Sequence, residues 1–276
     1  MGPPAGGRPA VNLNPTWEFV NQILEYWNRK AEQMGTDPAA TMKDVILRGM
    51  EIAVIGDRLT ADDDLLDVGA GNGYAATHWA ARCRSVTALD YSPGMVDAAK
   101  RAVAEAGVAN VQVRQGNVLD LSELAGRFSA ASAVRVLINL PTEEEQYAGL
   151  GQLVSVLRPG GRLFLVEGIQ EPSDALNAAR VGVGLPPNEI DWHNRLFARE
   201  KVEAALSREC EIEEKIDFGE YYFLSRVVHP LLVAPDEPKF RGRMNEVARE
   251  VWESGILRGR FADLSRLILY VCRRRG

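Results

Sequence analysis

The sequence predicts an α/β fold in which helices cover both faces of a largely parallel sheet. In the middle of the chain, short apolar runs alternate with helical stretches five times, which is typical of strand–helix–strand crossovers. Cap and turn signals separate these runs, since Ser92-Pro93 can begin a helix and Thr142 and Glu145 form a capping box. Strands are therefore expected at 65–68, 86–89, 111–114, 130–138 and 162–166, and helices at 74–83, 93–106 and 143–157.

Two amphipathic helices are predicted before this alternating region. Apolar residues recur at three and four positions through 17–34 and again through 41–59. Because both helices lie outside the core alternation, the segment 16–60 is expected to act as a helical lid. Residues 1–15 are rich in proline and glycine and almost without apolar side chains, so they are predicted to be a disordered tail.

The alternation loosens after the fifth strand, and residues 168–198 are expected to be irregular. Helices are expected at 199–207 and 239–252, and the last two strands at 210–218 and 266–273. The 46 residues between those strands, 220–265, are far too many for a hairpin turn, so they are predicted to form an inserted cap. The predicted core is then 61–219 together with 266–276.

Composition excludes several classes of function. The chain has 276 residues, 46% hydrophobic and 25% charged, and its net charge of −6 provides no general attraction to nucleic acid or anionic lipid. No apolar run approaches the ~18 residues that a spanning helix needs, and no signal-peptide core is present, so a soluble cytoplasmic protein is expected. The spacing of its three cysteines and three histidines predicts neither a disulfide framework nor a metal site.

A glycine-rich loop follows the first predicted strand. Residues 65–74 read Leu-Leu-Asp-Val-Gly-Ala-Gly-Asn-Gly-Tyr and lead from the strand into a helix. Glycines allow the backbone to adopt positive φ and approach a ligand closely, while the helix N-terminus offers free N–H groups. Asp90, 23 residues after Asp67, ends the next strand, where a carboxylate can accept both hydroxyls of a ribose.

At these residues the sequence resembles the class I S-adenosylmethionine-dependent methyltransferases, over about 61–219 and 266–276. The Leu-Arg-Pro-Gly-Gly turn at 157–161 belongs to the same resemblance. It implies a Rossmann-like, doubly wound sheet of seven strands with the last one antiparallel, S-adenosyl-L-methionine as cofactor and S-adenosyl-L-homocysteine as product. It implies that the loop lies against the methionine moiety, that Asp90 holds the ribose, and that Tyr91 and Met95 flank the adenine. The implied cofactor residues are Asp67, Gly69, Gly71, Gly73, Asp90, Tyr91, Met95, Asn117 and Val118, with Asn117 at a position where the family often has aspartate.

Two alternatives remain open. A nicotinamide-dependent oxidoreductase would explain Gly71-x-Gly73-x-x-Ala76 as a relaxed dinucleotide motif, although four residues, 67–70, then separate the strand from its first glycine and Asp67 would abut the pyrophosphate. A non-catalytic, methyltransferase-like binding module would carry the same motifs without activity. Failure of the protein to bind the methionine-derived cofactor would favour that second alternative.

The methyl acceptor is predicted to be a small molecule. Residues 135–140, at the end of the fourth strand, lack the Asn/Asp-Pro-Pro-aromatic sequence that marks many amide and nucleobase N-methylating enzymes, and no basic stripe with interleaved aromatics is present. The catalytic candidates are His193, whose ordinary pKa lies near working pH, and Glu167 at the end of the fifth strand. Either residue could equally have a structural function. O-methylation is favoured over N-methylation, and monomer and homodimer stay open.

Arginines are concentrated in the segments expected to face the cleft, in an otherwise acidic protein. Arg48 and Arg135 are predicted to contact the cofactor carboxylate, and the others to bind an acidic acceptor such as a phosphate, a carboxylate or a nucleotide-linked sugar. Each could instead be a surface ion-pair partner. The substrate-binding candidates are Arg180, Trp192, Asn194, Arg195, Tyr221, Tyr222 and Arg226.

Overall fold

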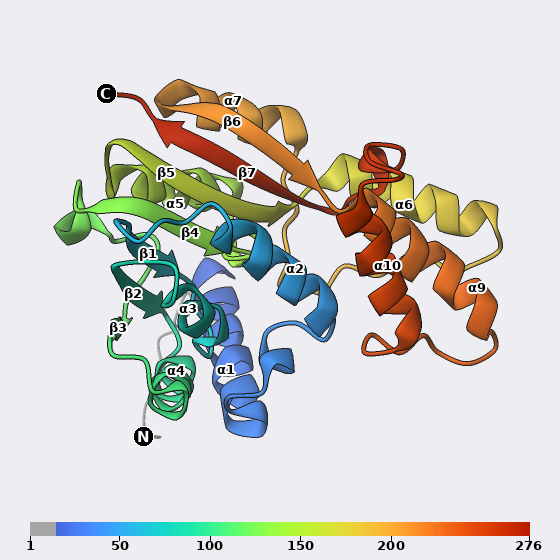
Figure 1. The fold of residues 1–276 in the computed structure, drawn as a ribbon, viewed down its shortest axis with the longest axis horizontal. Coiled ribbons are helices and arrows are strands. Elements are labelled where there is room, and N and C mark those ends of the chain that lie inside the picture. The colour runs from blue at the N-terminus through green and yellow to red at the C-terminus, as the bar shows by residue number, and fades with distance from the viewer. Residues whose placement is uncertain (1–14) are drawn as a thin grey trace, which may run out of the picture.

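Residues 15–276 are described by a computed structural model, and their strands form one seven-stranded sheet (Figure 1). The strand order is β3-β2-β1-β4-β5-β7-β6, in which β7 is antiparallel to both of its neighbours and the remaining pairs are parallel. The bounds are β1 Asp64–Val68, β2 Ser85–Asp90, β3 Val111–Gln115, β4 Phe128–Val134, β5 Leu157–Gly168, β6 Cys210–Asp217 and β7 Leu267–Arg274. The predicted fold class is confirmed. The tail predicted at 1–15 lies outside the described residues except for its last one.

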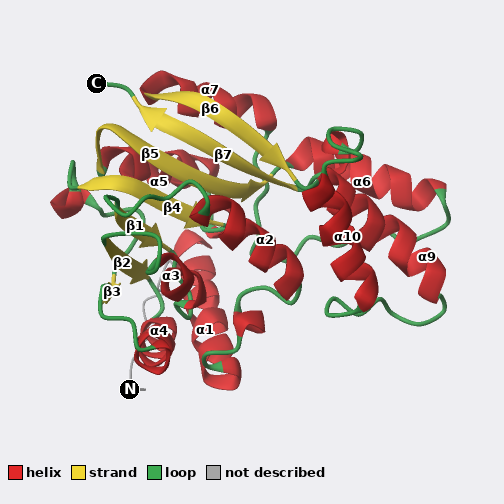
Figure 2. Cartoon of the chain, in the orientation of Figure 1, coloured by secondary structure: helices red, strands yellow, loops and turns green. Residues whose placement is uncertain are grey.

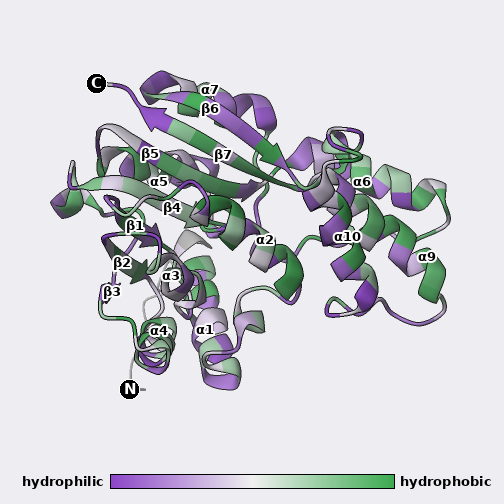
Figure 3. Cartoon of the chain, viewed as in Figure 1, coloured by the Kyte–Doolittle hydropathy of each residue, from purple (hydrophilic) through white to green (hydrophobic). Residues whose placement is uncertain are grey.

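Helices cover both faces of the sheet because neighbouring residues of a strand point to opposite sides. Leu65 belongs to the apolar cluster that includes α2 and α3, whereas the next residue, Leu66, belongs to the cluster of α5 and α7. Figure 3 shows the central strands as mostly hydrophobic and the edge strand β6 as largely hydrophilic. The covering helices are α2 Val45–Gly56, α3 Tyr74–Trp79, α4 Pro93–Ala106, α5 Glu143–Ser155 and α7 Arg199–Glu209.

Further helices lie outside the alternating core. Helix α1, Pro15–Met34, packs on α4, and a short 3-10 turn, Pro38–Ala40, leads to α2. Between β6 and β7 the chain forms α8 Gly219–Tyr222, a π-helix Phe223–Val228, α9 His229–Val233 and α10 Arg243–Ser254. These helices stand beyond the carboxyl end of β5, beside α6 (Gln170–Gly182), as Figure 2 shows. None of the described helices is both long and apolar enough to cross a membrane.

Two predictions from the sequence are wrong in detail. The segment 168–198 is not wholly irregular, because α6 occupies its first half; few of the residues of this helix are buried apolar side chains, so its periodicity is weak. The fourth strand ends at Val134 rather than at 138, since Arg135 adopts a positive φ of 58° and a 3-10 turn, Leu137–Asn139, follows.

Candidate functional site

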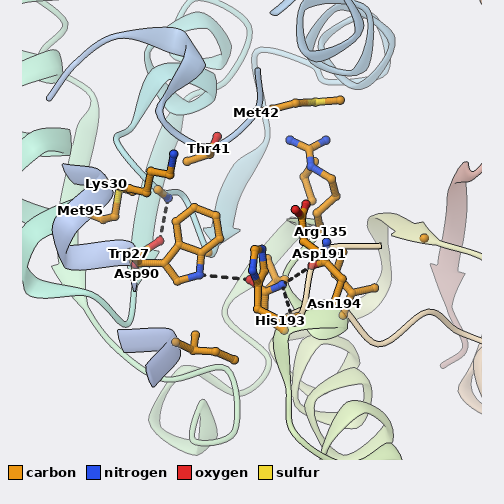
Figure 4. A pocket seen from close by; sticks show the side chains of 18 of the residues that line it. Trp27, Lys30, Thr41, Met42, Asp90, Met95, Arg135, Asp191, His193 and Asn194 are labelled. Carbon is orange, nitrogen blue, oxygen red and sulfur yellow. Dashed lines mark hydrogen bonds between the residues drawn. The ribbon is translucent and has the colours of Figure 1, made fainter. Parts of the chain in front are cut away.

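A cavity of about 630 Å³ lies at the carboxyl ends of the parallel strands (Figure 4). Its walls come from the loops after β1, β2 and β4, from α1 and α2, and from the segment after α6. The residues before β7 and the start of the inserted cap complete it. Open α/β sheets bind their ligands at this edge, so the cavity is the candidate site.

The loop after β1 has the conformation that its glycines predicted. Gly69 and Gly71 adopt φ values of 67° and 56°, in the left-handed region. A Cβ atom on Gly69 would lie 2.3 Å from Cγ2 of Val136, and one on Gly71 would lie 2.7 Å from Cγ2 of Thr41. Both glycines line the cavity, whereas Gly73 caps α3 and does not. At both positions a side chain would collide with a neighbouring residue and the backbone φ is positive, so the fold requires glycine there.

Two buried carboxyl groups flank this loop. Asp90 accepts hydrogen bonds from the N–H groups of Gly71 (2.7 Å) and Ser92 (2.9 Å), and burial raises its pKa to about 6. Asp67 accepts a hydrogen bond from the Ser132 hydroxyl at 2.8 Å, and burial raises its pKa to about 7. The second oxygen of Asp67 is buried and has no hydrogen-bond partner among the described residues. A cationic or hydrogen-bonding ligand in the cavity would satisfy it.

Tyr91 and Met95, which the resemblance places beside the adenine, line the cavity, as do the implied cofactor residues Asn117 and Val118. Met95 and Val118 are buried, and Tyr91 is 41% exposed. The amide oxygen of Asn117 accepts the N–H of Leu119 at 2.9 Å. This oxygen would therefore accept from a ligand through its second lone pair.

Arg48 and Arg135 both reach the cavity, and both are already hydrogen bonded. Arg48 is buried, donates to the Pro38 carbonyl and to Oδ1 of Asn72 (3.2 Å), and lies 4.9 Å from the ring centre of Tyr74. Its pKa is lowered to about 10, first by burial, so it remains charged at neutral pH.

Arg135 forms an ion pair with Glu51 on α2, which is 1% exposed and whose pKa is raised by burial. The backbone of Arg135 is held in its positive-φ conformation by a 2.7 Å hydrogen bond from its N–H to the Val166 carbonyl. Non-glycine residues in this conformation cluster at functional sites. The pairing with Glu51 nevertheless means that Arg135 is not a free positive charge.

His193 lies in the wall of the cavity, in the loop after α6. It is 5% exposed, and its Nδ1 is buried without a partner among the described residues. The rings of Tyr26 and Trp27 from α1 lie 4.7 and 5.7 Å from it, centre to centre. Burial lowers the pKa of His193, while the charge of Asp191 acts in the opposite direction. The imidazole is therefore neutral at physiological pH and able to accept a proton.

Sequence reasoning missed the side chains that hold this loop and α1 together. Asn139 accepts a hydrogen bond from Nε1 of Trp27 (3.2 Å) and donates one to Oδ1 of Asn194 (2.8 Å). All three residues line the cavity. The available signal was the position of Asn139 just beyond the fourth strand, where polar side chains reach a ligand site.

Glu167, the second catalytic candidate, does not line the cavity. It is fully buried and accepts the N–H groups of Val136 (3.0 Å), Leu137 (2.7 Å) and Ile138 (3.4 Å). Burial raises its pKa to about 8, although these bonds favour the charged form. The carboxyl group thus fixes the turn after β4.

Four of the seven substrate-binding candidates lie away from the cavity wall. Arg180 donates to the carbonyls of Pro186 (2.9 Å) and Arg226, and Arg195 donates to the Pro141 carbonyl (2.9 Å). Trp192 is 53% exposed and packs on α1, and the Tyr221 hydroxyl donates to Asp44 at 2.7 Å. The candidates that line the cavity are Asn194, Tyr222 and Arg226.

Comparison with known proteins identifies the central part of the chain. Residues 65–161 match the family described as "Methyltransferase domain". Over 102 residues the chain is 37% identical to the ubiquinone biosynthesis O-methyltransferase of Xanthomonas axonopodis pv. citri (strain 306). This match covers 37% of this chain and 41% of that relative. The chain thus matches less than half the length of this curated relative.

Solved structures share the whole arrangement at low sequence identity. The N-methyltransferase NodS from Bradyrhizobium japonicum WM9, solved with S-adenosyl-L-homocysteine, has a TM-score of 0.55 at 16% identity, covering 92% of this chain and 98% of its own. The [4+2]-cyclase SpnF has a TM-score of 0.56 at 19% identity, covering 81% and 80%. Residues 65–161 are thus a class I methyltransferase domain within a Rossmann-like fold, and the cofactor of this class is S-adenosyl-L-methionine.

Proposed function

We propose that the protein transfers a methyl group from S-adenosyl-L-methionine to a small-molecule acceptor held in the cavity. The observation that carries this proposal is that one cavity joins the glycine loop and Asp90 to the unpartnered imidazole of His193. The cofactor, when bound, supplies an electrophilic methyl group on a sulfonium. The unpartnered oxygen of Asp67 fits a ligand with positive charge, and Gly69 and Gly71 bring the loop backbone to the cavity wall.

The residues of the chain would supply alignment and proton transfer. A displacement at a methyl group needs the attacking atom in line with the leaving sulfur, so positioning is the main contribution of the protein. His193, neutral and buried, would accept the proton of an acceptor hydroxyl, which favours O-methylation. Asn139 and Trp27 would hold its loop against α1. Glu167 would act only by fixing the turn after β4.

We also propose that α1 and the inserted cap form a lid. Both supply residues to the cavity wall, and neither belongs to the sheet or to its crossover helices. A lid that excludes water protects a reactive methyl donor from hydrolysis and completes the site around the acceptor. On this view α1 and the helices of 220–265 move on the core of 61–219 and 266–276, whereas α2, the second helix of the predicted lid 16–60, stays packed on the sheet.

The test is binding followed by transfer. Calorimetry should show that S-adenosyl-L-homocysteine binds more tightly than NADH, and labelled S-adenosyl-L-methionine should then methylate a member of a panel of small hydroxylated metabolites. Preference for NADH would instead favour the oxidoreductase alternative. Failure to bind the methionine derivatives, or tight binding without transfer to any member of the panel, would favour the non-catalytic module.

A further inference from the structure

The part of the cavity under the inserted cap has a floor at the junction of β5 and β7. Leu267 pairs with Gly168, and the N–H of Ile169 donates to the carbonyl of Arg266 at 2.8 Å. Arg266 lines the cavity, as does Tyr222 from the cap, and the charge of Arg266 acts on the pKa of the Tyr222 hydroxyl. Because substrates in this fold meet the cofactor beyond the carboxyl ends of the strands, this region is available to the acceptor.

The arginines of this region differ in whether they are already paired. Arg226 forms an ion pair of 2.5 Å with Asp44, and Arg135 forms one with Glu51. Arg266, in contrast, has no ion-pair partner and no side-chain hydrogen bond among the residues that the structure describes. Other carboxylates line the cavity from β1, β2, α5 and the segment after α6. The charge available to an anion here is therefore that of the unpaired Arg266, not a net charge of the whole wall.

Tyr222 adds an uncharged donor beside this arginine. The residue is 4% exposed and lines the cavity, and its hydroxyl has no hydrogen-bond partner among the described residues. Burial raises the pKa of Tyr222 to about 12, although the charges of Arg226 and Arg266 lower it. The phenol thus stays protonated and able to donate to an acceptor oxygen.

Two aromatic residues, Tyr222 and Phe240, line the cavity in this region. The guanidinium of Arg226 lies 4.6 Å from the ring centre of Phe240 and 5.7 Å from that of Tyr222. Met42 and Leu267 also line the cavity. Cofactor and acceptor must share the 630 Å³, so a small, flat acceptor suits the space that is left.

We propose that Arg266 and Tyr222 bind an oxyanion, a carboxylate or a phosphate monoester, on a small aromatic acceptor. This inference rests on the proposed function and extends it to the class of acceptor. The planar fork of Arg266 offers two parallel donors to an oxyanion, and the Tyr222 hydroxyl can donate to the same group. The sequence also predicted an anionic acceptor. Arg266, however, is not among the five arginines that the sequence indicated as ligands of the cofactor or the acceptor.

The experiment uses three probes that differ in charge: 4-hydroxybenzoate, 4-hydroxyphenyl phosphate and the neutral 4-hydroxybenzamide. Each is titrated by calorimetry into the full chain saturated with S-adenosyl-L-homocysteine. At least one anion should bind about tenfold or more tightly than the amide, and the anion that binds better identifies the oxyanion. Arg266→Gln should abolish this preference, Arg266→Lys should keep part of it, and Tyr222→Phe should reduce it. Arg260→Gln, an exposed arginine away from the cavity, should leave it unchanged.

The outcomes separate this proposal from the function on which it rests. If S-adenosyl-L-homocysteine does not bind, both fail. If it binds but neither anion is preferred over the amide, the oxyanion site is wrong while the proposed function stands. A preference that survives both Arg266→Gln and Tyr222→Phe would also overturn the assignment. Should Arg266→Gln not fold, the comparison of anions with amide in the parent and in Tyr222→Phe still decides.

Discussion

The indole Nε1 of Trp27 donates a hydrogen bond of 3.2 Å to Oδ1 of Asn139 and thereby joins α1 to the end of the fourth strand. The same amide donates through Nδ2 to Asn194, in the loop that carries His193. A single side chain thus links the proposed lid, the sheet and the loop around the cavity. The opening of α1 and the opening of this loop should therefore be coupled.

Asn139→Ala tests this coupling. Loss of the amide should speed hydrogen exchange in both 20–34 and 188–196 by about 3- to 10-fold, the effect of removing ~0.5–1.5 kcal/mol from a local opening equilibrium. Exchange in the central strands should not change. Asn110→Ala, which removes hydrogen bonds to the carbonyls of Ala80 and Cys83 away from the cavity, is the control. Faster exchange in only one of the two segments would show that Asn139 does not couple them.

Addition of S-adenosyl-L-homocysteine should slow hydrogen exchange in the two proposed lid segments. The expected result is protection of α1 and of 220–265 in addition to the loops after β1 and β2, because closure buries the backbone of both segments. The measurement is exchange with and without the ligand at saturating concentration. Protection confined to 65–140 would contradict the lid and leave the cap without a closing function.

The order and type of the core elements could be predicted because each is determined locally. Apolar runs of strand length, the N-cap at Thr142 and the glycine loop act within a few residues, and the strands appeared in the expected order, although β5 begins at Leu157 rather than at 162. The end of the fourth strand could not be predicted. It depends on Glu167, a residue 30 positions away from Leu137, which accepts the N–H groups of the turn.

The acceptor side of the site was harder to predict for the same reason. An arginine is available to a ligand only if no carboxylate of the folded chain pairs with it. This depends on tertiary contacts and not on the local sequence. Arg226 proved to be paired with Asp44, 182 positions away, whereas Arg266 has no such partner among the described residues. The sequence could indicate that arginines lie near the cavity, but it could not distinguish a paired arginine from an unpaired one.

Asp90→Ala should weaken the binding of S-adenosyl-L-homocysteine by about 30-fold or more. Two ribose hydroxyls would lose a charged acceptor, a loss of roughly 2–4 kcal/mol, and the N–H of Gly71 would lose its partner as well. Calorimetry measures the change directly. Asp97→Ala, an exposed aspartate on α4, is the matched control and should bind as the parent does. Equal affinity in Asp90→Ala would remove Asp90 from the cofactor site.

Glu167→Ala should reduce the free energy of unfolding by about 3 kcal/mol, because it leaves buried N–H groups of the turn after β4 without an acceptor. Glu167→Gln keeps one acceptor oxygen and should cost less. Urea denaturation measures both, with the exposed Glu123→Ala as control. If Glu167→Gln instead abolished turnover while leaving stability and S-adenosyl-L-homocysteine affinity intact, Glu167 would return to the catalytic machinery.

His193→Gln should lower kcat by about 10²–10⁴ with the affinity for S-adenosyl-L-homocysteine unchanged, once an acceptor hydroxyl has been identified. The pH profile separates a base from a structural residue. Burial lowers the pKa of His193 below its ordinary 6.5, so the neutral, proton-accepting form dominates above that pKa. The rate of the parent protein should thus fall as the pH decreases through the pKa of His193 and stay level above that pKa. This acidic limb should disappear in His193→Gln and persist in His78→Gln, which changes an exposed histidine. An acidic limb retained in His193→Gln at full turnover would assign the proton to another group, and His193 would then serve only to pack α1 against its loop.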